Sequence, residues 1–149
     1  MGGVGMVPGG TQARFLLVED NPQDARLLQE AFRETSVRPE VTHCANAEKA
    51  WKALQEALKA PGNLLPNLLL LDLNLPGTSG HELLERMRGV PLLERLPVII
   101  LSSSQHQADV QRARGNQATA YMAKPLTMDG YVALAQDLVT LWADGRLKA

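Results

Sequence analysis

The sequence predicts an α/β protein in which a parallel five-stranded sheet is covered by helices on both faces. Short apolar runs alternate five times with longer amphipathic stretches. The runs at 68–71 and 98–101 are apolar at every position, which indicates strands buried on both faces at the centre of a parallel sheet. The length of 149 residues favours one domain with its own core.

Each predicted strand is followed by a predicted helix. The strands are expected at 15–18, 40–45, 68–71, 98–101 and 118–123. A helix over 47–60 would place apolar side chains on one face. Other helix starts are marked by capping residues, which accept hydrogen bonds from free backbone N–H groups. These are Asn21 before Pro22, Ser79 with Glu82, Ser104 with Gln107, and Thr127.

The folded domain is expected to span residues 13–144. Residues 1–12 contain five glycines and one proline and offer too little apolar surface to repay ordering, so a flexible tail is predicted there. Residues 145–149 are expected to form a short C-terminal tail. Because few residues follow the last predicted helix, we expect a stand-alone domain without a DNA-binding or catalytic output module.

Composition argues against nucleic acid and membranes as partners. The formal net charge is −1, and the nearest approach to a basic cluster is interleaved with acids, whereas duplex-binding proteins concentrate positive charge on one face. Its members are Arg86, Arg88, Arg95, Arg112 and Arg114. No apolar run approaches the roughly 18 residues of a membrane span, and the N-terminus lacks the features of a signal peptide.

The chain has a single cysteine, Cys44, so no internal disulfide can form and a cytoplasmic location is expected. Cys44 lies in an apolar stretch and is interpreted as a core residue. The three histidines, His43, His81 and His106, lack the spacing of metal ligands and are interpreted as structural or surface residues.

Side chains suited to chemistry follow four of the five predicted strands. Glu19 and Asp20 follow the first strand, Asp72 the third, Ser102 the fourth and Lys124 the fifth. Because ligands of open parallel sheets bind at the carboxyl ends of the strands, we expect these side chains to converge. Helix capping or a turn explains one such acid equally well, but the five residues together favour a functional site.

Three carboxylates at one edge repel one another. Two like charges about 4 Å apart cost about 4 kcal/mol at an effective dielectric constant near 20, so the acids must bind protons or a cation. Oxygen ligands with room for water suit Mg²⁺. Asp72 is the best candidate for a nucleophile toward a phosphoryl group, because it follows the most apolar strand. Lys124 and Ser102 would then contact the phosphoryl oxygens.

These residues resemble the receiver domain of bacterial response regulators. The matching segments are 16–21 (LLVEDN), 71–76 (LDLNLP), Gly80, 97–102 (PVIILS) and Lys124-Pro125, within a resemblance that covers residues 14–143. It implies a flavodoxin-like (βα)5 doubly wound parallel sheet with strand order 2-1-3-4-5. It also implies a two-component signalling switch that takes a phosphoryl group from a sensor histidine kinase onto Asp72. Such a switch is not an enzyme beyond Mg²⁺-dependent self-phosphorylation and slow autodephosphorylation.

The resemblance also implies roles for individual residues. The ligands of Mg²⁺ or Mn²⁺ would be the Asp20 and Asp72 side chains, the main-chain carbonyl of Asn74 and, through a water molecule, Glu19. Ser102 takes the position of the hydroxyl switch residue. Tyr121 takes that of the aromatic switch residue, although packing at the sheet edge explains an aromatic side chain there equally well. The Lys124–Pro125 peptide would be cis.

A narrower resemblance connects the chain to the single-domain regulators of bacterial phytochromes. It depends on the long connection at 60–66, the run at 66–76 and the last helix, which ends in Leu141-Trp142. It implies a phytochrome-type sensor histidine kinase as partner and a homodimer as a common assembly. Trp142 is interpreted as a helix-packing residue that could contribute to a dimer face.

Two other functions fit parts of the sequence. A metal-dependent phosphohydrolase could act on an external substrate through Asp72, but such enzymes commonly carry a second acid two residues later, where this chain has Asn74. A phosphorylation-independent binding module is the second alternative, either as a vestigial receiver or as a flavodoxin-like nucleotide binder. No glycine-rich phosphate loop supports nucleotide binding.

Overall fold

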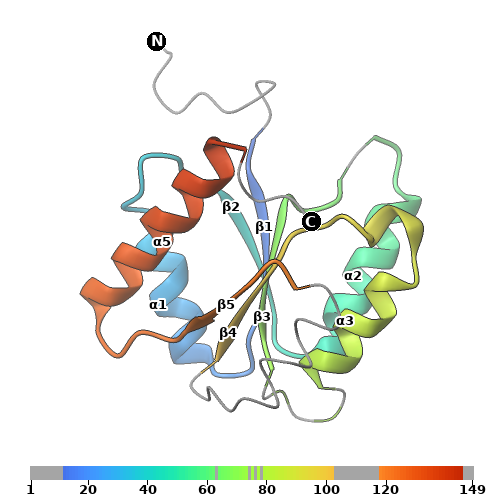
Figure 1. Ribbon diagram of the computed structural model, residues 1–149, viewed down its shortest axis with the longest axis horizontal. Helices are drawn as coiled ribbons and strands as arrows, with labels where there is room; N and C mark the ends of the chain where they lie inside the picture. The colour runs from blue at the N-terminus through green and yellow to red at the C-terminus, as the bar shows by residue number, and fades with distance from the viewer. Residues whose placement is uncertain are drawn as a thin grey trace.

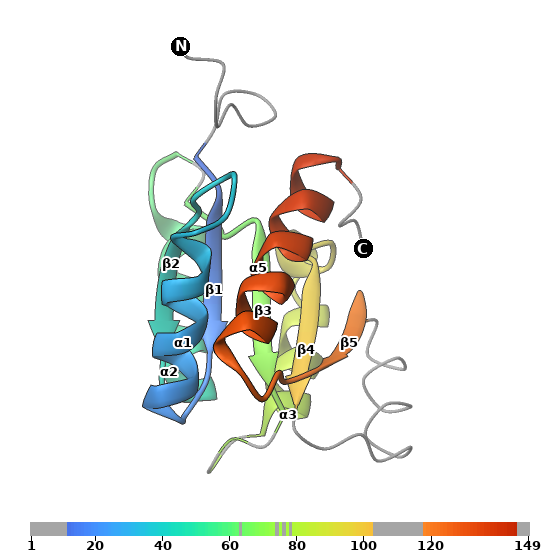
Figure 2. The same cartoon turned by 90° about the vertical axis from the view of Figure 1, so that its left-hand side faces the viewer.

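The computed structural model describes residues 12–62, 64–73, 75, 77, 79–102 and 118–145. Five parallel strands form one sheet in the order β2-β1-β3-β4-β5. Helices α1 and α5 cover one face of this sheet, and α2 and α3 cover the other (Figures 1 and 2). The fold class and strand order predicted from the sequence are therefore confirmed.

The strands lie close to their predicted positions. They are β1 (Arg14–Val18), β2 (Glu40–Cys44), β3 (Leu68–Asp72), β4 (Val98–Ser102) and β5 (Ala120–Ala123). Only β5 differs from its prediction by more than one residue at an end. Its start is later because the hydroxyl group of Thr119 takes the place of a ladder acceptor, receiving a hydrogen bond from the Val98 amide at 3.1 Å.

Burial differs strongly between the centre and the edges of the sheet. All five residues of β3 and all five of β4 are buried, as their apolar runs predict. In β2 only Cys44 is buried, and no residue of β5 is buried. Both outer strands pair on one side only. The sheet therefore has a closely packed centre and two loosely packed edges.

Three helices begin directly after capping residues predicted from the sequence, and the helix predicted at 47–60 spans residues 47–59. Their bounds are α1 (Pro22–Phe32), α2 (Ala47–Lys59), α3 (Gly80–Arg88) and α5 (Met128–Ala143), with a short 3₁₀ turn, η2, at Pro91–Leu93. The Asn21 side chain accepts hydrogen bonds from two amides of α1. The hydroxyl groups of Ser79 and Thr127 each accept one from the third residue after them. These bonds satisfy amides that a helix start leaves unpaired.

Two apolar layers fill the spaces between sheet and helices. On the side of α1 and α5, the ring of Phe15 packs edge-on against Phe32 and Trp142, at centroid distances of 5.4 and 6.3 Å. On the side of α2 and α3, Trp51 packs against a second buried cluster that includes Cys44. The predicted packing roles of these residues are confirmed. Both layers run along the sheet faces, so they fix the strand ends where polar side chains emerge.

Several predictions concern residues outside the described part of the chain. These are the N-terminal tail apart from Gln12, the helix start at Ser104, His106 and residues 146–149. Within the described residues, no helix is both long enough and apolar enough to cross a membrane. The predicted cis peptide is wrong, because the Lys124–Pro125 bond is trans. The trans form is intrinsically favoured before proline by about 0.5–1 kcal/mol, so resemblance alone could not settle this bond.

Candidate functional site

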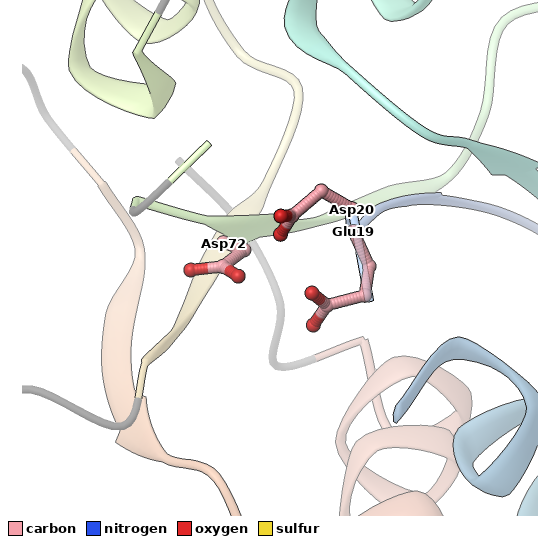
Figure 3. A group of neighbouring side chains, drawn as sticks. All are labelled: Glu19, Asp20 and Asp72. Atoms are coloured by element: carbon pink, nitrogen blue, oxygen red, sulfur yellow. The ribbon is translucent and has the colours of Figure 1, made fainter. Parts of the chain in front are cut away.

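Four of the sequence-predicted site residues meet at the carboxyl edge of the sheet. Glu19 and Asp20 follow β1, Asp72 ends β3, and Lys124 follows β5. Figure 3 shows the carboxylates of Glu19 and Asp20 turned toward the side on which Asp72 lies. The parallel order β1-β3-β4-β5 brings these strand ends together, although the residues are far apart in the sequence.

The three acids form a cluster that suits a hard divalent cation. One carboxylate oxygen from each of Glu19, Asp20 and Asp72 lies within 4.8 Å of the others. Glu19 and Asp72 are buried, whereas Asp20 is exposed, so the cluster opens to water on one side. Carboxylate oxygens with access for water are the donors that Mg²⁺ and Mn²⁺ prefer. The residues present therefore fit such an ion.

Lys124 joins two of these three acids, Glu19 and Asp72, into one ion-pair network. Its Nζ lies 2.6 Å from Glu19 Oε1 and 3.0 Å from Asp72 Oδ2. A third carboxylate, that of Asp24, lies 3.2 Å from the same nitrogen. Removing the lysine would leave the buried carboxylates of Glu19 and Asp72 without their cationic partner, which is strongly destabilising. The network therefore fixes the ends of β1, β3 and β5 relative to one another.

Glu19 and Lys124 both have a raised pKa, which favours their protonated forms. Burial raises the pKa of Glu19 from 4.5 to about 7, even though hydrogen bonds from Lys124 and the Asn21 amide lower it. Burial also lowers the pKa of Lys124, but its hydrogen bonds to Glu19 and Asp72 outweigh burial and raise it above the ordinary value. Protonation of Glu19 removes a negative charge and protonation of Lys124 keeps a positive one, so both reduce the repulsion among the carboxylates, as a bound cation would.

The backbone of Glu19 is held by the end of the neighbouring strand β2. Its amide donates to the carbonyl oxygen of Cys44 at 3.0 Å. Nε2 of His43 lies 2.7 Å from the carbonyl oxygen of Glu19. A carbonyl only accepts, so this contact requires a proton on Nε2. The Glu19 carboxylate also accepts a hydrogen bond from the Asn21 amide at 3.1 Å. His43 therefore supports the segment that carries both acids.

The loop after β3 packs closely on the start of α3. A Cβ atom on Gly80 would lie 2.6 Å from the carbonyl oxygen of Asp72 and 2.9 Å from Cα of Leu73. Both of these atoms belong to the backbone, so neither can turn aside. Gly77, in the same loop, has φ +72°, a conformation that glycine adopts without strain. The carboxylate of Asp72 is thus supported by a closely fitted backbone.

The two predicted switch residues lie on β4 and β5. Ser102 is buried at the end of β4, and its carbonyl oxygen accepts a hydrogen bond from the Lys124 amide at 3.1 Å. Tyr121 is half-buried on β5 and packs against the apolar layer beneath α2 and α3. Ser102 also lines a cavity of about 210 Å³ next to Lys124. These positions are compatible with the predicted roles and do not test them.

The structure adds residues that sequence reasoning did not assign to the site. No role at the site was predicted for Asp24, and His43 was interpreted only as a structural or surface residue. Asp24 lies in the first turn of α1, which starts directly after the acids of β1, and this short spacing was the available signal. For His43 the local sequence contains no comparable signal. The predicted metal ligand Asn74 lies outside the described residues.

Comparison with known proteins points to one family. The response regulator receiver domain matches residues 15–136. Response regulator Rcp1 of Synechocystis sp. is 31% identical over 130 residues, which cover 87% of this chain and 88% of that protein. The probable methanogenesis regulatory protein FilR2 of Methanothrix harundinacea is also 31% identical, over 86% of this chain and 82% of its own length.

Solved structures give the same result. The phosphorylated cyanobacterial phytochrome response regulator RcpA superposes with a TM-score of 0.82 at 29% identity, covering 93% of this chain and 99% of that one. The Mn²⁺-bound form of Rcp1 superposes with a TM-score of 0.77 at 31% identity, covering 89% and 95%. The similarity therefore extends over nearly the whole of each relative, in both sequence and fold.

Proposed function

The chain belongs to the response regulator receiver domain family, and from this premise we propose that it accepts a phosphoryl group on Asp72. The donor in this proposal is a phosphohistidine of a sensor histidine kinase. Phosphorylation would change which protein surfaces the domain binds. The observation that carries the proposal is the meeting of a buried Asp72 with Lys124 and two further acids at one edge of the sheet.

Asp72 is proposed as the nucleophile. One of its carboxylate oxygens attacks phosphorus, the bond from phosphorus to the imidazole nitrogen breaks, and that nitrogen keeps the electron pair. Lys124, already 3.0 Å from Asp72 Oδ2, is placed to stabilise charge on the phosphoryl oxygens. A Mg²⁺ or Mn²⁺ ion held by Glu19, Asp20, Asp72 and the main chain of Asn74 would supply further positive charge.

Ser102 and Tyr121 are proposed to transmit the change. The hydroxyl group of Ser102 would donate a hydrogen bond to a phosphoryl oxygen and so shift the end of β4. Tyr121 pairs with Ile100 in the ladder between β4 and β5, so a shift of β4 would change the position of Tyr121. Tyr121 is half-buried against the apolar layer beneath α2 and α3, and an inward movement of its side chain would alter the surface at this edge of the sheet. Only contacts that differ between the two states can drive such a change.

A phytochrome-type histidine kinase is the proposed partner. Support comes from the similarity to RcpA, which is described as a cyanobacterial phytochrome response regulator. Self-association is proposed as well, with the half-buried Trp142 of α5 as a candidate contact. The free, buried thiol of Cys44 is compatible with a reducing cytoplasm, where we place this exchange.

The test is phosphorylation by acetyl phosphate in Mg²⁺, measured by mass spectrometry of the intact protein. Wild type is expected to gain one phosphoryl group, and Asp72→Asn is expected to gain none because its amide is a poor nucleophile. Asp129→Asn, which changes an exposed acid in the first turn of α5, is the matched control and is expected to label normally. Labelling of Asp72→Asn at the wild-type level would refute the assignment. Multiple turnover of small phosphate esters would point to a phosphohydrolase.

A further inference from the structure

Asp24 contacts the lysine of the site without belonging to the acid cluster. Its Oδ2 accepts a hydrogen bond from Lys124 Nζ at 3.2 Å. The same nitrogen lies 2.6 Å from a Glu19 oxygen and 3.0 Å from an Asp72 oxygen. An ammonium group has three N–H donors, and three carboxylates suffice to use all of them. A phosphoryl oxygen that binds Lys124 must therefore take a donor from one of these acids.

The three carboxylates differ in how easily they can be released. The side chains of Glu19 and Asp72 are each 5% exposed, whereas that of Asp24 is 30% exposed. A carboxylate that loses its partner while buried pays a large desolvation penalty, and one that reaches water does not. Asp24 also has the longest of the three distances. It is therefore the partner that Lys124 loses most readily.

Charge favours the same conclusion. The carboxylates around Lys124 outnumber its single ammonium group, and a phosphoryl group brings further negative charge. Glu19 and Asp72 also face the cation cluster, where a metal ion can neutralise them. Asp24 has no such compensation and lies next to the lysine that the phosphoryl group needs. Its carboxylate therefore opposes phosphoryl binding in two ways, by repulsion and by occupying a donor.

The space beside the ion pair allows the partners to separate. A cavity of about 210 Å³ is lined by Asp24, Ser102, Lys124 and Tyr131, among others. It lies against both members of the pair, so open space adjoins the two side chains that have to separate. Because Ser102 also lines this cavity, the proposed phosphoryl-binding hydroxyl and the Asp24–Lys124 pair adjoin the same space.

We propose that Asp24 is a positioning residue that restrains Lys124 in the unphosphorylated state and competes with the phosphoryl group for its ammonium. Phosphorylation breaks the Asp24–Lys124 ion pair and releases the first turn of α1 from the loop after β5. This inference rests on the proposed function, because it assumes that Asp72 is the phosphoacceptor. In this proposal the Asp24 carboxylate weakens phosphoryl binding, so removing the charge of Asp24 strengthens it.

The test is calorimetric titration of beryllofluoride, a phosphoryl analogue, into the full chain at saturating Mg²⁺. Asp24→Asn keeps the shape of the side chain and removes its charge, and it is expected to bind the analogue about three- to tenfold more tightly than wild type. Asp24→Glu retains a carboxylate and is expected to stay near wild type. Asp129→Asn removes one exposed negative charge from another helix start and is expected to change the affinity less than about twofold.

Each outcome decides between the alternatives. Equal or weaker binding by Asp24→Asn overturns the inference, because the carboxylate would then be neutral or helpful. An equal gain in Asp129→Asn also overturns it, because the effect would reflect net charge alone. A titration of Mg²⁺ without beryllofluoride must show no comparable gain for Asp24→Asn, since the restraint acts on the anion. If the wild-type chain binds no beryllofluoride, both the proposed function and this inference are contradicted.

Discussion

Strands β3 and β5 both deliver a charged residue to the site, yet they are built differently. Every residue of β3, including Asp72, is buried, and the strand pairs with a neighbour on each side. No residue of β5 is buried, and the strand pairs only with β4. The nucleophile is therefore carried by the most constrained strand of the sheet, and the lysine by one of the least constrained.

This difference suits the two tasks. A nucleophile has to be held in one geometry, and dense packing on both faces provides that. A residue that exchanges one anion for another has to move, and a half-buried edge strand can shift with little loss of packing. Tyr121, which lies on the same edge strand, shares this freedom. This difference in packing between β3 and β5 can be tested with matched substitutions.

The largest effect is expected from removing an apolar side chain of β3. Leu70 is fully buried, and Met122 of β5 is partly buried against the same apolar layer. Leu70→Ala is expected to lower the free energy of unfolding by about 3 kcal/mol, because it leaves a cavity. Met122→Ala is expected to lower it by about 1 kcal/mol, because less apolar area is lost.

Urea denaturation monitored by tryptophan fluorescence gives both free energies under the same conditions. The comparison fails if the two substitutions cost equal amounts, since β5 would then be as tightly packed as β3. Acetyl phosphate labelling of the folded Met122→Ala variant provides a second check. It should remain at the wild-type level if packing at this edge contributes little to the position of Asp72.

An intermediate effect is expected at the loop that follows β3. Gly80→Ala would place a methyl group 2.6 Å from the carbonyl oxygen of Asp72, so the backbone has to shift. We expect a loss of about 2 kcal/mol in stability, together with slower labelling of Asp72. Gly89→Ala, at the other end of α3, meets its nearest atom at 3.5 Å and should be nearly neutral. If both substitutions lower the stability equally, the backbone of the loop after β3 can shift to accommodate the methyl group.

Most of the fold could be predicted from the sequence because its signals are local. The apolar runs of β3 and β4 contain no polar residue before Asp72 and Ser102, and such runs are typical of central parallel strands. Side-chain caps at Asn21, Ser79 and Thr127 fixed three helix starts. The start of β5 was less accurate, because the Thr119 hydroxyl takes a ladder position that sequence periodicity does not reveal.

The site could be predicted in its strand-end residues and not in the side chains that reach them across the fold. Glu19, Asp20, Asp72 and Lys124 follow strands directly, so topology alone brings them together. Asp24 contacts Lys124, which lies 100 positions later in the sequence, and His43 of β2 contacts the carbonyl oxygen of Glu19, just after the neighbouring strand β1. Such contacts depend on the side-chain directions that only coordinates supply.

The smallest effect is expected from protonation of Glu19, whose ion pair with Lys124 joins the constrained part of the site to β5. In the folded, metal-free protein burial raises the pKa of Glu19 from 4.5 to about 7. Between these values the folded state binds more protons than the unfolded state, so the free energy of unfolding falls as the pH rises. We expect the free energy of unfolding of wild type to decrease by on the order of 1 kcal/mol across this interval in EDTA, and that of Glu19→Gln not to show this decrease.

The quantity to measure is the difference in the free energy of unfolding between wild type and Glu19→Gln at each pH, because it cancels all groups except Glu19. Parallel stability curves would show that the bond to Lys124 fully compensates the burial of Glu19, and the ends of β1 and β5 would then be more firmly joined than the exposure of β5 suggests.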